Sequence, residues 1–161
     1  MRILVTGGTG FTGKALVKRL HDDGHDVIAL DYKEGVKTGE IRDWGVKVII
    51  GSVTDATVVT EAMRGVDVVH HLAAAFRELD VSNTYYHEVN VGGAKIVLDA
   101  AVAAGVKRFI YCSTCGVHGN VKNPPANEDA PIAAADYYQQ TKYEAEPLVH
   151  EYQQQGLKTV I

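Results

Sequence analysis

The chain opens with the stretch Arg2-Ile3-Leu4-Val5-Thr6-Gly7-Gly8-Thr9-Gly10-Phe11-Thr12-Gly13, in which a short apolar run leads directly into glycines spaced three apart. The apolar run predicts a buried strand that turns sharply into a helix. Glycine permits that turn and lets the backbone approach a bound pyrophosphate. The phosphates would meet free N–H groups at the positive end of the helix dipole. The stretch therefore predicts a dinucleotide site at the start of an α/β fold.

An acidic residue at the end of the next predicted strand supports this interpretation. Asp31 follows Gly13 by eighteen residues, close to the spacing of about twenty at which a carboxylate binds an adenosine ribose. Because Asp31 would repel a 2′-phosphate, NAD is favoured over NADP, although Lys33 would soften that repulsion. Residues 8–14 also fit the phosphate-binding loop of nucleoside triphosphatases, but Ala15 stands where that loop needs a hydroxyl for magnesium.

The composition limits the kinds of partner that the chain can have. With 161 residues, 46% of them hydrophobic, one domain with a real core is expected. The formal net charge of −4 predicts no nucleic-acid partner. No apolar run reaches the roughly eighteen residues that a membrane span requires, and the first strand leaves no room for a signal peptide. We therefore expect a cytoplasmic protein with no membrane contact.

Apolar, β-branched runs alternate with helix-like segments along the whole chain. Because the strands are continuously apolar, both faces of the sheet should be covered, which predicts a doubly wound parallel sheet of Rossmann-like α/β class. The run 156–161 begins a sixth strand and stops there, so residues 1–161 are expected to be the first half of a longer protein. Strands are predicted over 3–6, 27–31, 46–50, 66–72 and 109–113, helices over 12–23, 56–64, 83–104 and 137–155, and a loop over 123–129.

The chain's two cysteines and its adjacent histidines do not predict a metal site. Cys112 and Cys115 form a C-x-x-C pair, but no second pair of ligands follows at zinc-site spacing. A redox pair would open a helix, whereas Cys112 closes a predicted strand. His70 and His71 face opposite sides of their strand. We therefore expect reduced thiols and no bound metal.

Tyr138 and Lys142 stand four residues apart on a predicted helix, about 6 Å apart along its axis. Lowering the pKa of a tyrosine from about 10 to about 7 requires roughly 4 kcal/mol. An ammonium at that distance supplies about 3 kcal/mol at an effective dielectric constant of about 20. A positively charged nicotinamide could supply the rest, so Tyr138 would then serve as an acid and base.

Taken together, these features resemble the extended branch of the short-chain dehydrogenase/reductase family, the NAD-dependent sugar epimerases and dehydratases. The matching motifs occur in order and span the whole chain. They are the glycines Gly7, Gly10 and Gly13, the acid Asp31, His71-Leu72-Ala73-Ala74, Asn90-Val91-Gly92-Gly93, the run Ser113-Thr114-Cys115-Gly116-Val117-His118-Gly119, and the pair Tyr138 and Lys142.

The resemblance implies roles for individual residues. Thr114 would bind the reacting oxygen of the substrate, Tyr138 would transfer the proton, and Lys142 would hold the nicotinamide ribose and lower the pKa of the tyrosine. It also implies that residues 1–161 are an NAD-binding Rossmann-like domain without the C-terminal substrate domain of the family, and that the protein is a homodimer through the helices at 90–104 and 137–155. The implied NAD site comprises Gly7, Gly10, Phe11, Thr12, Gly13, Asp31, Tyr32, Lys33, Ser52, Val53, Leu72, Ala73, Ala74, Asn90 and Lys142.

Three departures from the family pattern limit what it implies. Ser52 stands where an aspartate often meets adenine, and a serine accepts a hydrogen bond more weakly. His118 replaces a tyrosine near the expected substrate, where it either tunes specificity or packs the loop. Cys115 and Gly116 replace the two acids of the sugar 4,6-dehydratases, which disfavours that dehydration.

Reversible oxidation of an alcohol therefore remains as the predicted chemistry. The small-molecule substrate would be a nucleotide sugar or another secondary alcohol or ketone, and the sequence does not separate dehydrogenation from epimerisation. The alternative is a module of the same fold that senses NAD without catalysis. The intact pair of Tyr138 and Lys142 favours an enzyme over such a sensor.

Overall fold

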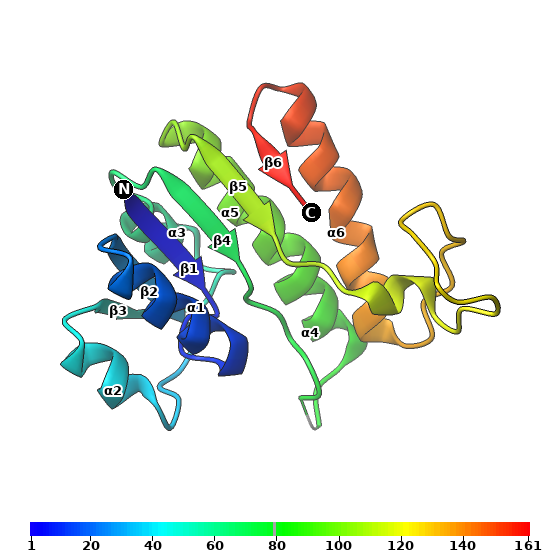
Figure 1. The fold of residues 1–161 in the computed structure, drawn as a ribbon, viewed down its shortest axis with the longest axis horizontal. Coiled ribbons are helices and arrows are strands. Elements are labelled where there is room, and N and C mark those ends of the chain that lie inside the picture. Colours follow the sequence, from blue (N-terminus) through cyan, green and yellow to red (C-terminus); the bar gives the residue numbers. More distant parts are fainter. Residues whose placement is uncertain (79) are drawn as a thin grey trace.

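A computed structural model, which describes residues 1–78 and 80–161, shows a six-stranded parallel sheet (Figure 1). The strand order is β3-β2-β1-β4-β5-β6. Strands β2 and β3 are therefore added on one side of β1 and strands β4 to β6 on the other, and the strand order reverses between β1 and β4. In doubly wound folds, ligands bind at the carboxyl ends of the strands at this point. The predicted fold class is confirmed. The strands are β1 (Arg2–Thr6), β2 (Asp26–Asp31), β3 (Lys47–Ile50), β4 (Val68–His71), β5 (Arg108–Tyr111) and β6 (Thr159–Val160).

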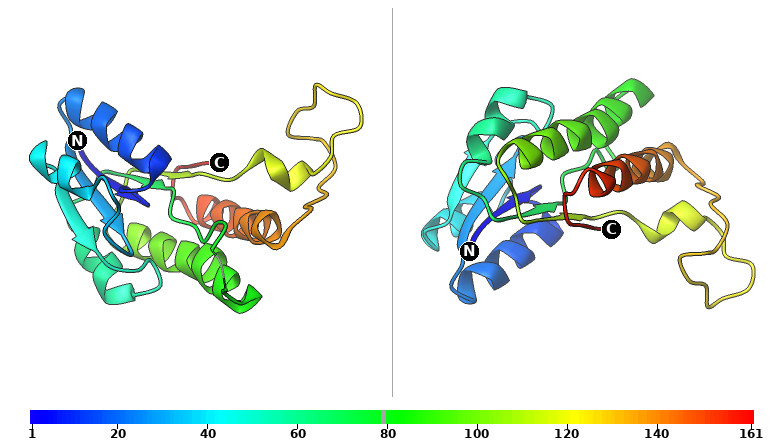
Figure 2. Two further views of the ribbon diagram at one scale, coloured as in Figure 1. Left: turned by 90° about the horizontal axis from the view of Figure 1, so that it is seen from below. Right: turned by 90° about the horizontal axis from the view of Figure 1, so that it is seen from above.

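Helices cover both faces of this sheet, as the continuously apolar strands predict. Figure 2 shows α1 on one face and α3, α5 and α6 on the other. The long irregular connection 119–136, which contains the predicted loop at 123–129, extends away from the sheet. The helical segments are α1 (Phe11–Asp22), α2 (Thr38–Asp43), α3 (Ala56–Ala62), α4 (Asn83–His87), the π-helical η1 (Glu88–Gly92), α5 (Gly93–Ala103), the 3₁₀ turn η2 (Cys115–His118) and α6 (Tyr137–Gln154).

The core has two parts, one on each face of the sheet. Successive residues of β1 point to opposite faces. Leu4 belongs to the larger cluster, with Val97 of α5 and Val149 of α6. Val5 belongs to the smaller cluster, with Val17 of α1. All five side chains are buried, and this burial on both faces holds the carboxyl ends of the strands in place.

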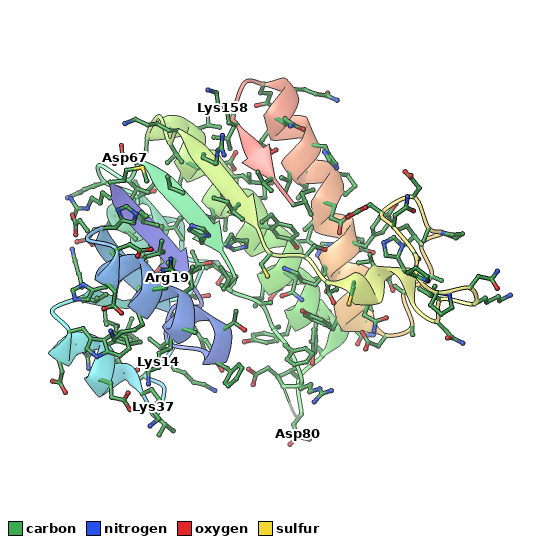
Figure 3. The ribbon with its side chains drawn as sticks, in the orientation of Figure 1. Lys14, Arg19, Lys37, Asp67, Asp80 and Lys158 are labelled. Carbon is green, nitrogen blue, oxygen red and sulfur yellow. The ribbon has the colours of Figure 1, made fainter. Side chains whose placement is uncertain are left out.

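The observed helices differ from the predicted ones in two places. The helix predicted over 83–104 is divided by the π-helical turn η1, which contains the buried Asn90. Helix α2 was not predicted, because Ile41 is the only buried apolar residue in its six residues. Glu40 of α2 forms ion pairs with two lysines. One is Lys14 of α1, and the other is Lys37, whose Nζ lies 2.8 Å from the Glu40 carboxylate. Lys14 and Lys37 lie near each other at that edge (Figure 3).

Candidate cofactor and catalytic site

The glycine loop between β1 and α1 is folded so closely that a side chain at Gly7, Gly8 or Gly13 would collide with neighbouring backbone. Gly7 adopts a φ of +69°, and a Cβ there would lie 2.9 Å from the backbone nitrogen of Ala73. A Cβ at Gly13 would lie 1.9 Å from the carbonyl oxygen of Gly7. The loop thus packs directly onto the first turn of α1, the geometry expected of a pyrophosphate-binding turn.

A small pocket of about 200 Å³ lies at the carboxyl ends of β1, β2 and β4. The structure brings together most of the predicted cofactor residues there, although they come from distant parts of the sequence. Four further lining residues, Ala75, Glu78, Tyr85 and Val89, were not predicted. The predicted residues that line it are Gly7, Gly10, Asp31, Tyr32, Ser52, Val53, Leu72, Ala73 and Ala74.

Asp31 is held in this pocket by the glycine loop itself. Its Oδ2 accepts hydrogen bonds from the backbone nitrogen of Thr9 at 3.0 Å and from the Thr9 hydroxyl at 2.7 Å. Its Oδ1 accepts from the backbone nitrogen of Tyr32 at 2.9 Å. The Tyr32 hydroxyl donates to Oε1 of Glu78 at 3.0 Å and so joins two walls of the pocket. Thr9 was missed by the sequence analysis, although it lies inside the glycine stretch.

Several predicted cofactor residues do not line the pocket. Phe11 and Thr12 are exposed at the start of α1, and Gly13 is buried beneath the loop. Lys33 turns its ammonium over the ring of Tyr32, at 4.6 Å from the ring centroid. Asn90 and Lys142 do not line the pocket either. The contacts of all the predicted residues with a cofactor, including those that line the pocket, stay predictions.

Asn90 connects the loop after β4 to helix α6. Its Oδ1 accepts a hydrogen bond from the backbone nitrogen of Ala75 at 2.7 Å, and its Nδ2 donates to the carbonyl oxygen of Ala75 at 3.2 Å. The same Nδ2 donates to the Thr141 hydroxyl at 2.9 Å. Asn90 thus lies behind the pocket wall, and it holds that wall against the helix that contains Tyr138 and Lys142.

The three predicted catalytic residues lie near the carboxyl edge of the sheet. Thr114 follows β5 and accepts a hydrogen bond from the backbone nitrogen of Gly116 at 3.1 Å. Tyr138 and Lys142 are in the first turns of α6, whose N-terminus is capped by Asp136. Lys142 is 1% exposed. Burial lowers the pKa of the Lys142 ammonium to about 8, and electrostatic interaction with the nearby Cys112 and Glu146 opposes that shift.

The surroundings of Tyr138 in the protein alone shift its pKa upwards. Burial raises the pKa of the Tyr138 phenol, and electrostatic interaction with the nearby Cys112 and Asp136 adds to the shift. The sequence-based prediction was a pKa lowered by Lys142 together with an oxidised nicotinamide, and for the protein with NAD⁺ bound it stays a prediction. Lys142 is not among the groups that shift the Tyr138 pKa here, and its ammonium lies over the ring of Tyr111, 4.0 Å from the ring centroid. The Tyr138 ring instead packs on Phe76, with 4.7 Å between the ring centroids.

A wider groove of about 970 Å³ lies beside the end of β5. Thr114 lines it, as do the exposed free thiols of Cys112 and Cys115. His118 also lines the groove, and the contact between its Nδ1 and the carbonyl oxygen of Ala130, at 3.0 Å, holds the following loop. His118 is therefore placed for either role left open by the sequence. Across residues 1–78 and 80–161, no group of three or more His, Cys, Asp or Glu side chains is arranged to hold a metal ion.

A buried histidine lies between the pocket and Lys142. His71 is fully buried, and its Nδ1 lies 2.8 Å from the Thr6 hydroxyl oxygen, which accepts a hydrogen bond from the backbone nitrogen of Ala73 at 3.1 Å. Burial lowers the pKa of His71 to about 3, with the charge of Lys142 adding to the shift. The imidazole is therefore neutral at physiological pH.

This neutral burial predicts a loss of stability in acid. Unfolded His71 takes up a proton near pH 6.5, whereas the folded imidazole resists protonation until about pH 3. The free energy of unfolding should therefore fall as the pH falls through this window, by at most about 1.4 kcal/mol per pH unit from this group. This loss of stability is measured by denaturant unfolding of the wild type and of His71→Gln at pH values from neutral to 4. A pH-independent difference between the two proteins would contradict the assignment.

The fold and the pocket together define a dinucleotide-binding domain of the Rossmann type. The chain belongs to the NAD dependent epimerase/dehydratase family, whose model matches residues 3–161. The family resemblance seen in the sequence is thereby confirmed, and with it NAD as the cofactor of the family. None of the helices in the described ranges is long and apolar enough to cross a membrane.

Curated relatives and solved structures agree with this membership. The 3 beta-hydroxysteroid dehydrogenase/Delta 5-->4-isomerase of Mycobacterium tuberculosis is 36% identical over 157 residues, which cover 92% of this chain and 42% of the relative. The UDP-glucose 4-epimerase of Corynebacterium glutamicum is 32% identical over 146 residues, with coverages of 88% and 44%. The chain thus spans less than half the length of these curated relatives.

The solved structures match almost the whole chain. A short-chain dehydrogenase/reductase superfamily protein of Agrobacterium tumefaciens with bound NAD has a TM-score of 0.90 at 34% identity, over 100% of this chain and 48% of that one. A UDP-glucose 4-epimerase of Thermotoga maritima with UDP-glucose has a TM-score of 0.89 at 29% identity, and the match covers 99% of this chain and 53% of that one.

Proposed function

We propose that the chain is the cofactor-binding part of an NAD-dependent oxidoreductase or epimerase that acts on a secondary alcohol or ketone. The observation that carries the proposal is one arrangement of residues. A pocket containing Asp31 lies where the strand order reverses, and Thr114, Tyr138 and Lys142 lie near the same edge of the sheet. Relatives that act on steroids and on nucleotide sugars support a substrate of this broad class.

The fold provides groups in and near this pocket that suit parts of a dinucleotide. The closely packed glycine loop leaves room for a pyrophosphate, and the Asp31 carboxylate can accept hydrogen bonds from ribose hydroxyls. The buried ammonium of Lys142 makes no ion pair within residues 1–78 and 80–161 and can donate to a second ribose. NAD, when bound here, supplies the hydride acceptor for alcohol oxidation.

Proton transfer would be the work of the chain's own side chains. The Thr114 hydroxyl would donate a hydrogen bond to the substrate oxygen and fix its position. The raised pKa of Tyr138 keeps its phenol protonated at neutral pH, so the phenol can donate a proton to a carbonyl oxygen. The reverse step, which removes a proton from an alcohol, requires nearby positive charge such as an oxidised nicotinamide carries.

Other parts of the sequence-based interpretation also remain proposals. Residues 1–161 would form a single NAD-binding domain, and the substrate would be a nucleotide sugar or another small alcohol or ketone. The homodimer predicted through α5 and α6 stays a prediction, as does the cytoplasmic location. Tyr138, Lys142 and Thr114 are present together, which supports an enzyme over a module that only senses NAD.

Removing the Asp31 carboxylate should weaken the binding of NAD⁺. Hydrogen bonds to a charged group contribute about 1.5–3 kcal/mol, so Asp31→Ala should raise the dissociation constant by roughly 10- to 100-fold. Calorimetric titration of the chain with NAD⁺ measures this change, and circular dichroism verifies the fold.

The matched control is Asp22→Ala, which removes an exposed carboxylate of α1 that pairs with Lys18 at 2.5 Å. It should leave NAD⁺ affinity unchanged. Equal affinities of wild type and Asp31→Ala would contradict the proposed site. Binding that depends on Asp31, without hydride transfer to any alcohol tested, would point to the sensing module instead.

A further inference from the structure

Tyr111, the last residue of β5, contacts Lys142 in two ways. Its ring lies beneath the lysine ammonium, with 4.0 Å between Nζ and the ring centroid. Its hydroxyl donates a hydrogen bond to the backbone carbonyl oxygen of Lys142 at 3.2 Å. Both residues are 1% exposed. One side chain therefore fixes both the backbone and the charged end of the proposed catalytic lysine.

The ring contact matters because this ammonium has lost most of its water. Burial of a charged lysine favours its neutral form. The carboxylates in residues 1–78 and 80–161 make no ion pair with Lys142, although Cys112 and Glu146 oppose the effect of burial on its pKa without such contact. The face of an aromatic ring carries partial negative charge and attracts a cation, more strongly when the cation is desolvated. The Tyr111 ring thus opposes the tendency of burial to discharge the lysine.

The position of the Tyr111 ring is itself fixed by buried neighbours. The ring stacks on the imidazole of His71, with 5.8 Å between centroids and an interplanar angle of 27°. His71 is held in turn by the Thr6 hydroxyl of β1. Its ring also packs against that of Phe109, with 6.0 Å between the ring centroids. Because His71 stays neutral, it places no second positive charge beside Lys142. Thr6, His71 and Tyr111 therefore pack in sequence beneath Lys142, and these side chains hold the lysine without adding a charge of their own.

We propose that Tyr111 is a positioning residue, which holds the Lys142 side chain in place and keeps its ammonium charged for contact with the cofactor ribose. The proposal rests on the proposed function only for that last contact, because the support of the lysine is a property of the protein without cofactor. A residue that merely filled space would be replaced equally well by any apolar side chain of similar size. The aromatic face is the feature that distinguishes the two roles.

The test is a pH titration of Lys142 by nuclear magnetic resonance in the protein without NAD, with its Cε signal assigned by the loss of that signal in Lys142→Arg. Tyr111→Phe keeps the ring and should leave the lysine pKa nearly unchanged. Tyr111→Leu removes the ring and should lower the pKa by about one pH unit. Tyr143→Leu, which replaces an exposed tyrosine of α6, is the matched control and should cause no shift. Equal pKa values in the Phe and Leu variants would overturn the proposal.

A second substitution keeps the test decisive if the leucine variant does not fold. Tyr111→pentafluorophenylalanine preserves the shape of the phenylalanine ring while reversing the charge distribution on its face. The lysine pKa should then lie below that of Tyr111→Phe, and identical values would overturn the proposal.

NAD⁺ titration of the same variants separates this proposal from the proposed function. If Tyr111→Leu binds NAD⁺ more weakly than Tyr111→Phe does, both claims are supported: that Tyr111 positions Lys142, and that Lys142 contacts the cofactor. A shifted lysine pKa with unchanged NAD⁺ affinity would support the positioning of Lys142 by Tyr111 and contradict the contact between Lys142 and the ribose.

Discussion

Tyr138→Phe is expected to lower the rate of hydride transfer by about 10²- to 10⁴-fold, the range typical of a lost general acid or base, and to leave NAD⁺ affinity unchanged. The phenylalanine ring can keep the packing of Tyr138 on Phe76, so the start of α6 should retain its structure. Only the hydroxyl that transfers the proton is removed. The rate is measured in single turnovers, from the absorbance of NADH, with an alcohol that the wild-type protein oxidises.

The matched control for this prediction is Tyr143→Phe, one helical turn and one residue further along α6. Tyr143 is exposed, and the loss of its hydroxyl should leave the rate unaltered. If Tyr138→Phe instead lost NAD⁺ affinity in parallel with the rate, the hydroxyl would act in cofactor binding. An unchanged rate would remove Tyr138 from the proposed mechanism altogether.

The sheet could be predicted from the sequence because its strands are short, continuously apolar runs separated by helical segments. Leu4 and Val5 show why this works, since their burial on opposite faces requires helices on both sides. Helix α2 was missed because Ile41 is its only buried apolar residue. The π-helical turn around Asn90 was missed because a local change of helical pitch leaves no clear mark on apolar periodicity.

The candidate site was predictable where it depends on local chain geometry. The glycines follow from the turn that a strand–loop–helix unit must make, and Asp31 follows from its position at the end of the next strand, at the expected spacing after Gly13. Thr9, Phe76 and Tyr111 were not found, because their importance comes from contacts with Asp31, Tyr138 and Lys142 across the fold. For the same reason the sequence did not show that Lys142 makes no contribution to the Tyr138 pKa in the protein alone. Helical spacing gives the distance between two residues on one helix, but it does not reveal that a third residue attracts the ammonium.

Gly13→Ala is expected to abolish measurable NAD⁺ binding and to destabilise the fold. The added Cβ would lie 1.9 Å from the carbonyl oxygen of Gly7 and 2.9 Å from the Cα of Gly8, so backbone rather than a flexible side chain must move. Gly7 has little space to retreat, because its own Cβ position lies 2.9 Å from the backbone of Ala73. The loop must therefore open away from α1, which removes the surface proposed to bind the pyrophosphate.

The expected size of this effect follows from the cost of overpacking. Forcing an extra methyl group into a closely packed site costs about 1–3 kcal/mol, measured as a lower free energy of unfolding in denaturant. An affinity for NAD⁺ reduced by about 100-fold or more would correspond to roughly 3 kcal/mol.

Gly39→Ala provides the matched control, because a Cβ at Gly39 in α2 meets nothing within 4 Å. Alanine is the better helix former by about 1 kcal/mol, so this variant should bind NAD⁺ normally and be slightly more stable. A Gly13→Ala variant that binds NAD⁺ as the wild type does would show that the pyrophosphate does not depend on the closed loop. Such a result would contradict the assignment of the first turn of α1 as the cofactor site, even with the fold and the family unchanged.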